Sequence, residues 1–76
     1  MQTAHTASAP IFSVEALVKI RMGQGRTRAQ LARAAELDPS QLWRIETGRA
    51  VPYVSTVARL ARALDVPVSA LLVSAS

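Results

Sequence analysis

The sequence predicts an all-α fold, a compact domain of five short helices. Its 76 residues are enough for one small hydrophobic core. Half of the residues are hydrophobic, but only 4% are aromatic, and the apolar residues are largely Ala, Leu and Val rather than the β-branched and aromatic residues typical of strands. Apolar residues recur at three-and-four spacing between capping residues and glycines, which is the pattern of amphipathic helices.

The first two helices are expected over residues 13–23 and 28–35. Ser13 and Thr27 are residue types that cap a helix N-terminus. Gly25, together with Gly23, ends the first helix. A turn of only two residues then separates the second helix from the third.

The third helix is expected from Asp38 to Thr47. Asp38 is suited to the N-cap, and Pro39 stands at the first helical position, where a missing N–H costs nothing. Gly48 ends this helix. A fourth helix is expected over about 54–64, and a fifth over 68–73 after Pro67.

The two ends of the chain lack helical patterns. We expect a disordered leader over residues 1–12, the helical domain over 13–73 and a short tail over 74–76. The leader lacks the cationic and apolar regions of a signal peptide, and no apolar run is long enough to span a bilayer. We therefore expect a cytoplasmic protein without a membrane partner.

The outer face of the third helix carries the candidate functional residues. A helical wheel places Leu42 and Ile45 inward. Ser40, Trp43, Arg44 and Thr47 point outward, and Pro39, Gln41 and Glu46 lie on the flanks. Arg bonds guanine bidentately, and Gln or Ser can contact base edges or phosphates, so this face suits the major groove of DNA. The alternative is an ordinary solvated polar face, and a net charge of +4 does not by itself decide between the two.

The chain resembles the Cro/phage-repressor type of helix-turn-helix domain, also called the XRE family. The resemblance covers Leu17 to Leu72 and rests on the order and spacing of five segments. These are Leu17-Val18-Lys19-Ile20-Arg21, Thr27-Arg28-Ala29-Gln30-Leu31-Ala32-Arg33-Ala34-Ala35, Leu42-Trp43-Arg44-Ile45-Glu46-Thr47-Gly48-Arg49, Val51-Pro52 and Leu60-Ala61-Arg62-Ala63-Leu64-Asp65-Val66-Pro67. The resemblance implies a lambda-repressor-like fold.

The same resemblance implies roles for individual residues. Ser40 and Arg44 occupy the principal base-contacting positions, Arg28 a phosphate-contacting position, and Arg49 a position that anchors the DNA backbone. Trp43 either contacts DNA or lies flat over a neighbouring helix. The full set of expected DNA-binding residues is Arg28, Pro39, Ser40, Gln41, Trp43, Arg44, Thr47 and Arg49.

Two further positions are implied to be scaffold, and three depart from the family pattern. Arg21 and Glu46 are expected to form a structural ion pair between the first helix and the end of the third. Glu36 and Asp65 replace common glycines, and a left-handed backbone at Glu36 would cost on the order of 1 kcal/mol. Arg26 replaces a common apolar core residue and must extend outward or face phosphate.

The expected function is sequence-specific binding of double-stranded DNA by a transcriptional regulator, a repressor that acts as a homodimer on a palindromic operator. The C-terminal helix is the expected dimer interface, through Val66, Val68, Leu72 and Val73. The alternative is a protein-interaction module, such as an antitoxin or adaptor, with secondary DNA binding. An enzyme is disfavoured because there is no Cys, only one His, and the five carboxylates are scattered. No cofactor, metal or small-molecule ligand is expected.

Overall fold

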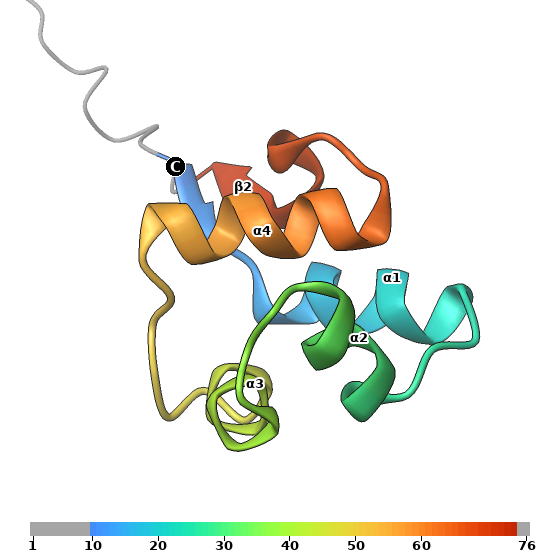
Figure 1. Ribbon diagram of the computed structural model, residues 1–76. Coiled ribbons are helices and arrows are strands. Elements are labelled where there is room, and N and C mark those ends of the chain that lie inside the picture. The colour runs from blue at the N-terminus through green and yellow to red at the C-terminus, as the bar shows by residue number, and fades with distance from the viewer. Residues whose placement is uncertain (1–9, 75–76) are drawn as a thin grey trace, which may run out of the picture.

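The computed structural model describes residues 10–74 as a layered arrangement of four α-helices, one 3-10 helix and a small antiparallel sheet (Figure 1). In chain order the elements are β1 (Pro10–Phe12), α1 (Val14–Gly23), α2 (Arg28–Ala34), α3 (Pro39–Glu46), α4 (Val54–Leu64), the 3-10 helix η2 (Val68–Leu71) and β2 (Leu72–Ser74). Figure 1 shows α3 at the edge of the molecule opposite α4 and the sheet. This arrangement leaves the outer side of α3 open.

Side-chain caps begin the first three helices at the predicted residues. The Ser13 hydroxyl accepts a hydrogen bond from the Ala16 N–H (3.0 Å), which starts α1. Thr27 and Gln30 form a reciprocal capping box at the start of α2. Asp38 caps α3, and Pro39 stands at its first turn.

The core lies between the helices and is built almost entirely from aliphatic side chains. The largest fully buried ones are Leu17, Leu31, Leu42, Ile45, Leu60, Leu64 and Leu71. Ala32 is also fully buried, and its small side chain allows α2 and α3 to approach closely. The core thus holds both helices of the α2–turn–α3 unit in a fixed relation.

The expected fifth helix is wrong. The chain forms the 3-10 helix η2 and then turns into the strand β2, which pairs antiparallel with β1 in the register Pro10–Ser74, Ile11–Val73 and Phe12–Leu72. A six-residue α-helix closes only about two internal hydrogen bonds, whereas the extended chain gains a strand partner. Leu72 and Val73 therefore belong to a strand and not to a C-terminal helix.

The expected boundaries of the helical domain also need correction. Residues 10–12, which we expected within a disordered leader, form β1, and Ser74, which we expected in the tail, ends β2. The remainder of the expected leader (1–9) and tail (75–76) lies outside the described residues. The folded unit is therefore longer at its N-terminal end than the sequence pattern indicated.

Glu36 and Asp65 both adopt the left-handed backbone conformation, with φ of 59° and 58°. Glu36 forms the turn between α2 and α3. The Arg59 side chain from α4 donates to the carbonyl of Ala35 (Nε, 3.1 Å) and through Nη2 to that of Glu36. The strained turn is thus fixed by a long-range contact, because an arginine side chain near a helix C-terminus satisfies otherwise free carbonyls.

The C-terminal end of α4 is held by the loop between α1 and α2. Gln24 Nε2 donates to the Leu64 carbonyl (2.8 Å), and Arg26 Nη1 donates to the Ala63 carbonyl (2.9 Å). Arg26 was expected to extend outward or face phosphate. Instead its guanidinium satisfies a carbonyl in the last turn of α4, where a positive charge also suits the helix dipole.

Candidate nucleic-acid interface

The helix α3 is fixed on its inner side and free on its outer side. Leu42 and Ile45 are buried in the core, as the helical wheel predicted. Pro39, Ser40, Trp43, Arg44 and Thr47 are exposed, and Gln41 is half-buried on the flank. The structure thus brings most of the predicted DNA-binding residues together on one surface.

Arg44 is the most available cation of this surface. Its side chain is exposed and makes no hydrogen bond or ion pair with any residue in the range 10–74. Its carbonyl accepts from the N–H groups of Arg49 (2.8 Å) and Ala50 (3.2 Å), which closes the turn after Gly48. The backbone at Arg44 is therefore fixed while all five guanidinium donors remain free.

Ser40 is tied to the cap of its own helix. Both the backbone N–H (3.0 Å) and the hydroxyl (2.9 Å) of Ser40 donate to Asp38 Oδ1. These hydrogen bonds, the backbone one first, hold the pKa of the Asp38 carboxyl below its usual value of 3.8, and the Arg44 charge acts in the same direction. The Ser40 hydroxyl is left as an acceptor, so it suits a donor group on a base edge or a bridging water.

Trp43 lies partly exposed beside Arg49. It remains 40% exposed, and the guanidinium carbon of Arg49 stands 4.8 Å from the centre of its ring. This distance is within the range of a cation–π interaction. The Thr47 hydroxyl donates its hydrogen to the Trp43 carbonyl (2.8 Å), so this hydroxyl is already engaged as a donor within α3. Trp43 and Arg49 thus form one unit at the C-terminal end of α3.

A groove of about 420 Å³ runs beside α3 and contains residues that the sequence analysis did not select. Its lining includes Ser40, Gln41 and Arg44 from α3, and Val51 and Tyr53 from the loop before α4. Val51, Tyr53 and the neighbouring Val54 are all strongly exposed. Three exposed apolar residues within the four residues 51–54, where the loop enters α4, were the signal that could have identified this part of the surface.

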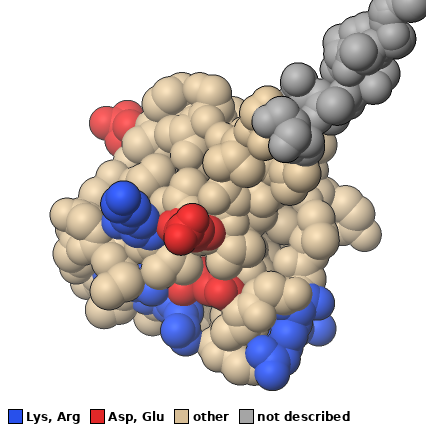
Figure 2. Space-filling view, turned by 180° about the vertical axis from the view of Figure 1, so that it is seen from behind, with Lys and Arg blue, Asp and Glu red and all other residues tan. Residues whose placement is uncertain are grey.

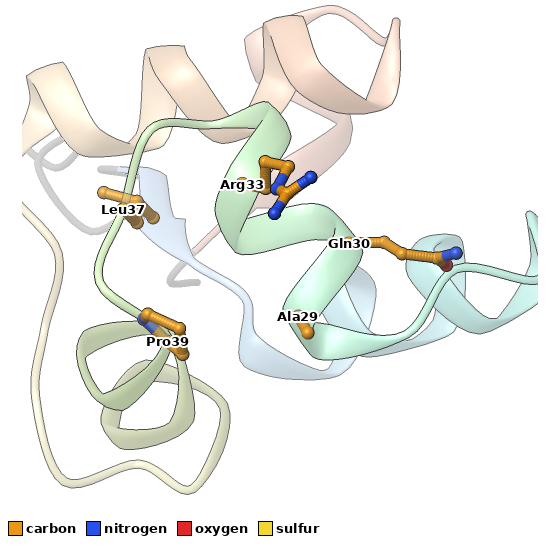
Figure 3. A pocket seen from close by; sticks show the side chains of 5 residues that line it. All are labelled: Ala29, Gln30, Arg33, Leu37 and Pro39. Atoms are coloured by element: carbon orange, nitrogen blue, oxygen red, sulfur yellow. The ribbon is translucent and has the colours of Figure 1, made fainter.

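A second groove, of about 450 Å³, lies between α2 and the start of α3 (Figure 3). Its lining includes Gln30 and Arg33 from α2, Leu37 from the turn and Pro39 from α3. Gln30 is engaged in the capping box, whereas Arg33 makes no hydrogen bond with the described residues. The predicted residue Pro39 thus lies at the edge where α2 and α3 meet.

Arg21 and Glu46 form the ion pair that the resemblance implied. Arg21 donates through Nε to Glu46 Oε2 (2.7 Å) and through Nη2 to Oε1 (3.1 Å). The Glu46 side chain is only 2% exposed and that of Arg21 only 11%. Arg28 also donates to Glu46, from Nε to Oε1 (2.9 Å), although its own side chain is 48% exposed. Nothing in the sequence pattern indicated this second arginine on the same carboxylate.

The residues expected at the dimer interface divide into two groups. Val66 and Leu72 are partly buried against the core. Val68 and Val73 are exposed, and Val73 pairs across the sheet with Ile11, which is also exposed. The apolar surface at this end of the molecule therefore includes a residue from β1 that was not selected.

Basic side chains form several groups on the face seen in Figure 2. In this view from behind, one blue group lies at the lower right, where the turned view places α3, and others lie at the lower left and left of centre beside acidic side chains (Figure 2). Within residues 10–74 there is no group of three or more His, Cys, Asp and Glu side chains that could hold a metal ion. No helix of that range is long and apolar enough to cross a membrane.

Two short helices joined by a tight turn, the second with an exposed polar face, define a helix-turn-helix unit. The comparisons with known proteins agree with this class. A family model described as a helix-turn-helix domain matches residues 14–72. The chain belongs to this family, which confirms the resemblance to the Cro/phage-repressor type predicted from the sequence. A search of curated proteins found no match.

Several solved structures share the fold. The restriction-modification controller protein C.AhdI from Aeromonas hydrophila is 28% identical, with a TM-score of 0.74 over 76% of this chain and 88% of that one. The clp gene regulator ClgR from C. glutamicum is 29% identical, with a TM-score of 0.72 over 76% and 75% of the two chains. The hypothetical transcription factor NHTF from Neisseria is 26% identical, with a TM-score of 0.76 over 80% and 70%.

Proposed function

We propose that this protein is a sequence-specific DNA-binding regulator of transcription that inserts α3 into the major groove. The observation that carries the proposal is Arg44, an exposed arginine on a rigidly seated helix, with all its side-chain donors free. Bidentate hydrogen bonding of arginine to guanine is the commonest specific contact of such helices. Ser40 and Gln41 stand beside it and supply further polar contacts to base edges.

Two arginines near the C-terminal end of α3 bind the DNA backbone. Arg28 lies at the start of α2 beside the end of α3, and Arg49 lies over Trp43 just beyond Gly48. Arginine at these positions suits phosphate binding, because two N–H donors of its planar guanidinium can bond two phosphate oxygens. The exposed Trp43 ring and the Tyr53 side chain add contacts to sugars or thymine methyl groups. Phosphate contacts of this kind fix the register of the helix in the groove.

We further propose that the protein acts as a homodimer on a palindromic operator. One helix contacts too few bases for useful specificity, and two copies would place their α3 helices about 34–36 Å apart, one turn of DNA. The exposed side chains Ile11, Val68 and Val73 at the sheet end support an interface there. Such a dimer would act most simply as a repressor, by excluding other proteins from the site it covers.

The decisive experiment is selection of preferred sites from random duplex DNA, followed by titration of the selected and scrambled duplexes at several salt concentrations. We expect an enriched motif with two-fold symmetry, at least about 10³-fold preference over the scrambled duplex and a steep fall in affinity with salt. The absence of any enriched motif would contradict a sequence-specific regulator. Binding to neither duplex would contradict DNA binding altogether.

A further inference from the structure

The Glu46 carboxylate is contacted by two arginines, although one would neutralise its charge. The buried carboxylate is already neutralised by Arg21, which contacts both oxygens and is itself nearly buried. Arg28 then adds a second guanidinium on Oε1. The three side chains together carry one net positive charge, and the only exposed member is Arg28.

The geometry of the Arg28 contact leaves a defined part of its side chain free. Only Nε donates to Glu46, and neither Nη nitrogen makes a hydrogen bond with the described residues. A guanidinium is a planar fork with five N–H donors, and the Nε–H shares one edge of that plane with a single Nη N–H. With this edge turned toward Glu46, the other three Nη donors are directed away from the carboxylate. Two of them, one from each Nη at the end of the fork, match the two oxygens of one phosphate.

We infer that Glu46 is a positioning residue for DNA binding, because it holds the Arg28 guanidinium in place for a phosphate of the DNA backbone. This inference rests on the proposed function. It goes beyond the structural ion pair with Arg21, because it gives the same carboxylate a second role toward the ligand. The net positive charge of the three side chains remains available to attract phosphate. The hydrogen bond to Glu46 already restricts the Arg28 side chain, so less conformational entropy is lost when DNA binds.

The same carboxylate couples the two ends of the helix-turn-helix unit. Glu46 is the last residue of α3, and Arg28 is the first residue of α2. A phosphate held by Arg28 is therefore fixed relative to α3 through one buried side chain. The position of the backbone contact and the depth of α3 in the groove are set together.

The test is a double-mutant cycle between Arg28→Gln and Glu46→Gln, measured by binding to a random-sequence duplex, since a phosphate contact does not depend on sequence. We expect Arg28→Gln to weaken binding and to reduce the salt slope by about 0.9, the value for one phosphate. Glu46→Gln should weaken binding by about 2- to 10-fold when Arg28 is present and by less than about 2-fold when it is replaced. A purely structural role of Glu46 predicts equal losses in both backgrounds. A competing role, in which Glu46 draws Arg28 away from DNA, predicts tighter binding.

Arg28→Lys provides an independent measurement that leaves the buried pair intact. Lysine keeps the positive charge, but it lacks the planar guanidinium that can donate to Glu46 from one edge and to phosphate from another. We expect Arg28→Lys to bind about 2- to 10-fold more weakly, while the control Arg33→Lys on the exposed face of α2 binds within about 2-fold of the wild type. Circular dichroism melts establish that each variant is folded. Equal binding by Arg28→Lys and wild type, or an additive cycle, would overturn the inference alone. Absence of binding by the wild type would overturn the proposed function as well.

Discussion

The guanidinium of Arg49 lies 4.8 Å from the centre of the Trp43 ring, at the end of the exposed face of α3. The two residues come from different elements, since Trp43 is within α3 and Arg49 follows the glycine that ends it. Their contact places a cation and an aromatic surface on the same edge as Arg44. This pair gives the proposed interface an intrinsic reporter, because Trp43 is the only tryptophan of the chain.

Duplex DNA is therefore expected to change the fluorescence of Trp43. The ring is 40% exposed before binding, and contact with the DNA backbone would replace its water and disturb its contact with Arg49. Trp43→Ala should weaken binding by about 2- to 5-fold, since an exposed cation–π contact is worth about 0.5–1 kcal/mol. Trp43→Phe should retain most of the affinity. Unchanged fluorescence at a DNA concentration where anisotropy of labelled DNA shows saturation would place Trp43 outside the interface.

Glu36→Gly is expected to stabilise the protein. Glu36 has φ of 59°, a conformation that costs an L-residue about 1–2 kcal/mol, whereas glycine adopts it freely but loses more backbone entropy on folding. The net gain in the free energy of unfolding should be about 0.5–1 kcal/mol, measured by urea denaturation. The matched control is Lys19→Gly in the middle of α1, which should lose about 1 kcal/mol. A loss in Glu36→Gly equal to that of the control would show that the left-handed turn is not strained.

The cap of α3 is expected to weaken in acid. The pKa of Asp38 is lowered in the folded protein by hydrogen bonds from Ser40, so ionised Asp38 contributes stability at pH values above its ordinary pKa of 3.8. That contribution is lost as the pH falls from about 3.8 through the lower folded pKa. The Tm of wild type should exceed that of Asp38→Asn at pH 6, and the difference should shrink below pH 4. A difference independent of pH would contradict an ionised cap.

The exposed sheet end is expected to govern the oligomeric state. Ile11 and Val73 face each other across the two strands, and about half of each residue's surface is exposed. Light scattering of the wild type should give a dimer mass, and Ile11→Lys with Val73→Lys should give a monomer that retains the helical circular dichroism spectrum. Arg62→Glu, an exposed charge reversal on α4, serves as a control that should remain dimeric. A concentration-independent monomer mass for the wild type would exclude this interface.

The parts of the fold that follow from local sequence were predictable. Ser13, Thr27 and Asp38 cap the helices that they were expected to cap, because a capping bond spans only two or three residues. Leu42 and Ile45 were placed inward by helical periodicity alone. These local rules also place Arg44 on the outer face of α3.

The parts that depend on distant partners were not predictable. The strands β1 and β2 are three residues each and too short for a periodic signal, and each is extended because the other is beside it. Arg26 and Arg59 bind carbonyl groups 37 and 23 residues away, and sequence spacing does not reveal such contacts. The ion pair between Arg28 and Glu46 is likewise a contact between distant residues that sequence spacing does not reveal.

The central claim is that α3 recognises DNA sequence through Arg44, and the most direct measurement is the binding of Arg44→Ala to the selected operator and to a scrambled duplex. Removal of a bidentate base contact should cost about 1–3 kcal/mol on the selected operator and relax the preference at one base pair of each half-site. Affinity for the scrambled duplex should fall much less. Arg44→Ala binding that retains the full preference of the wild type would contradict the assignment of α3 as the helix that recognises sequence through this residue.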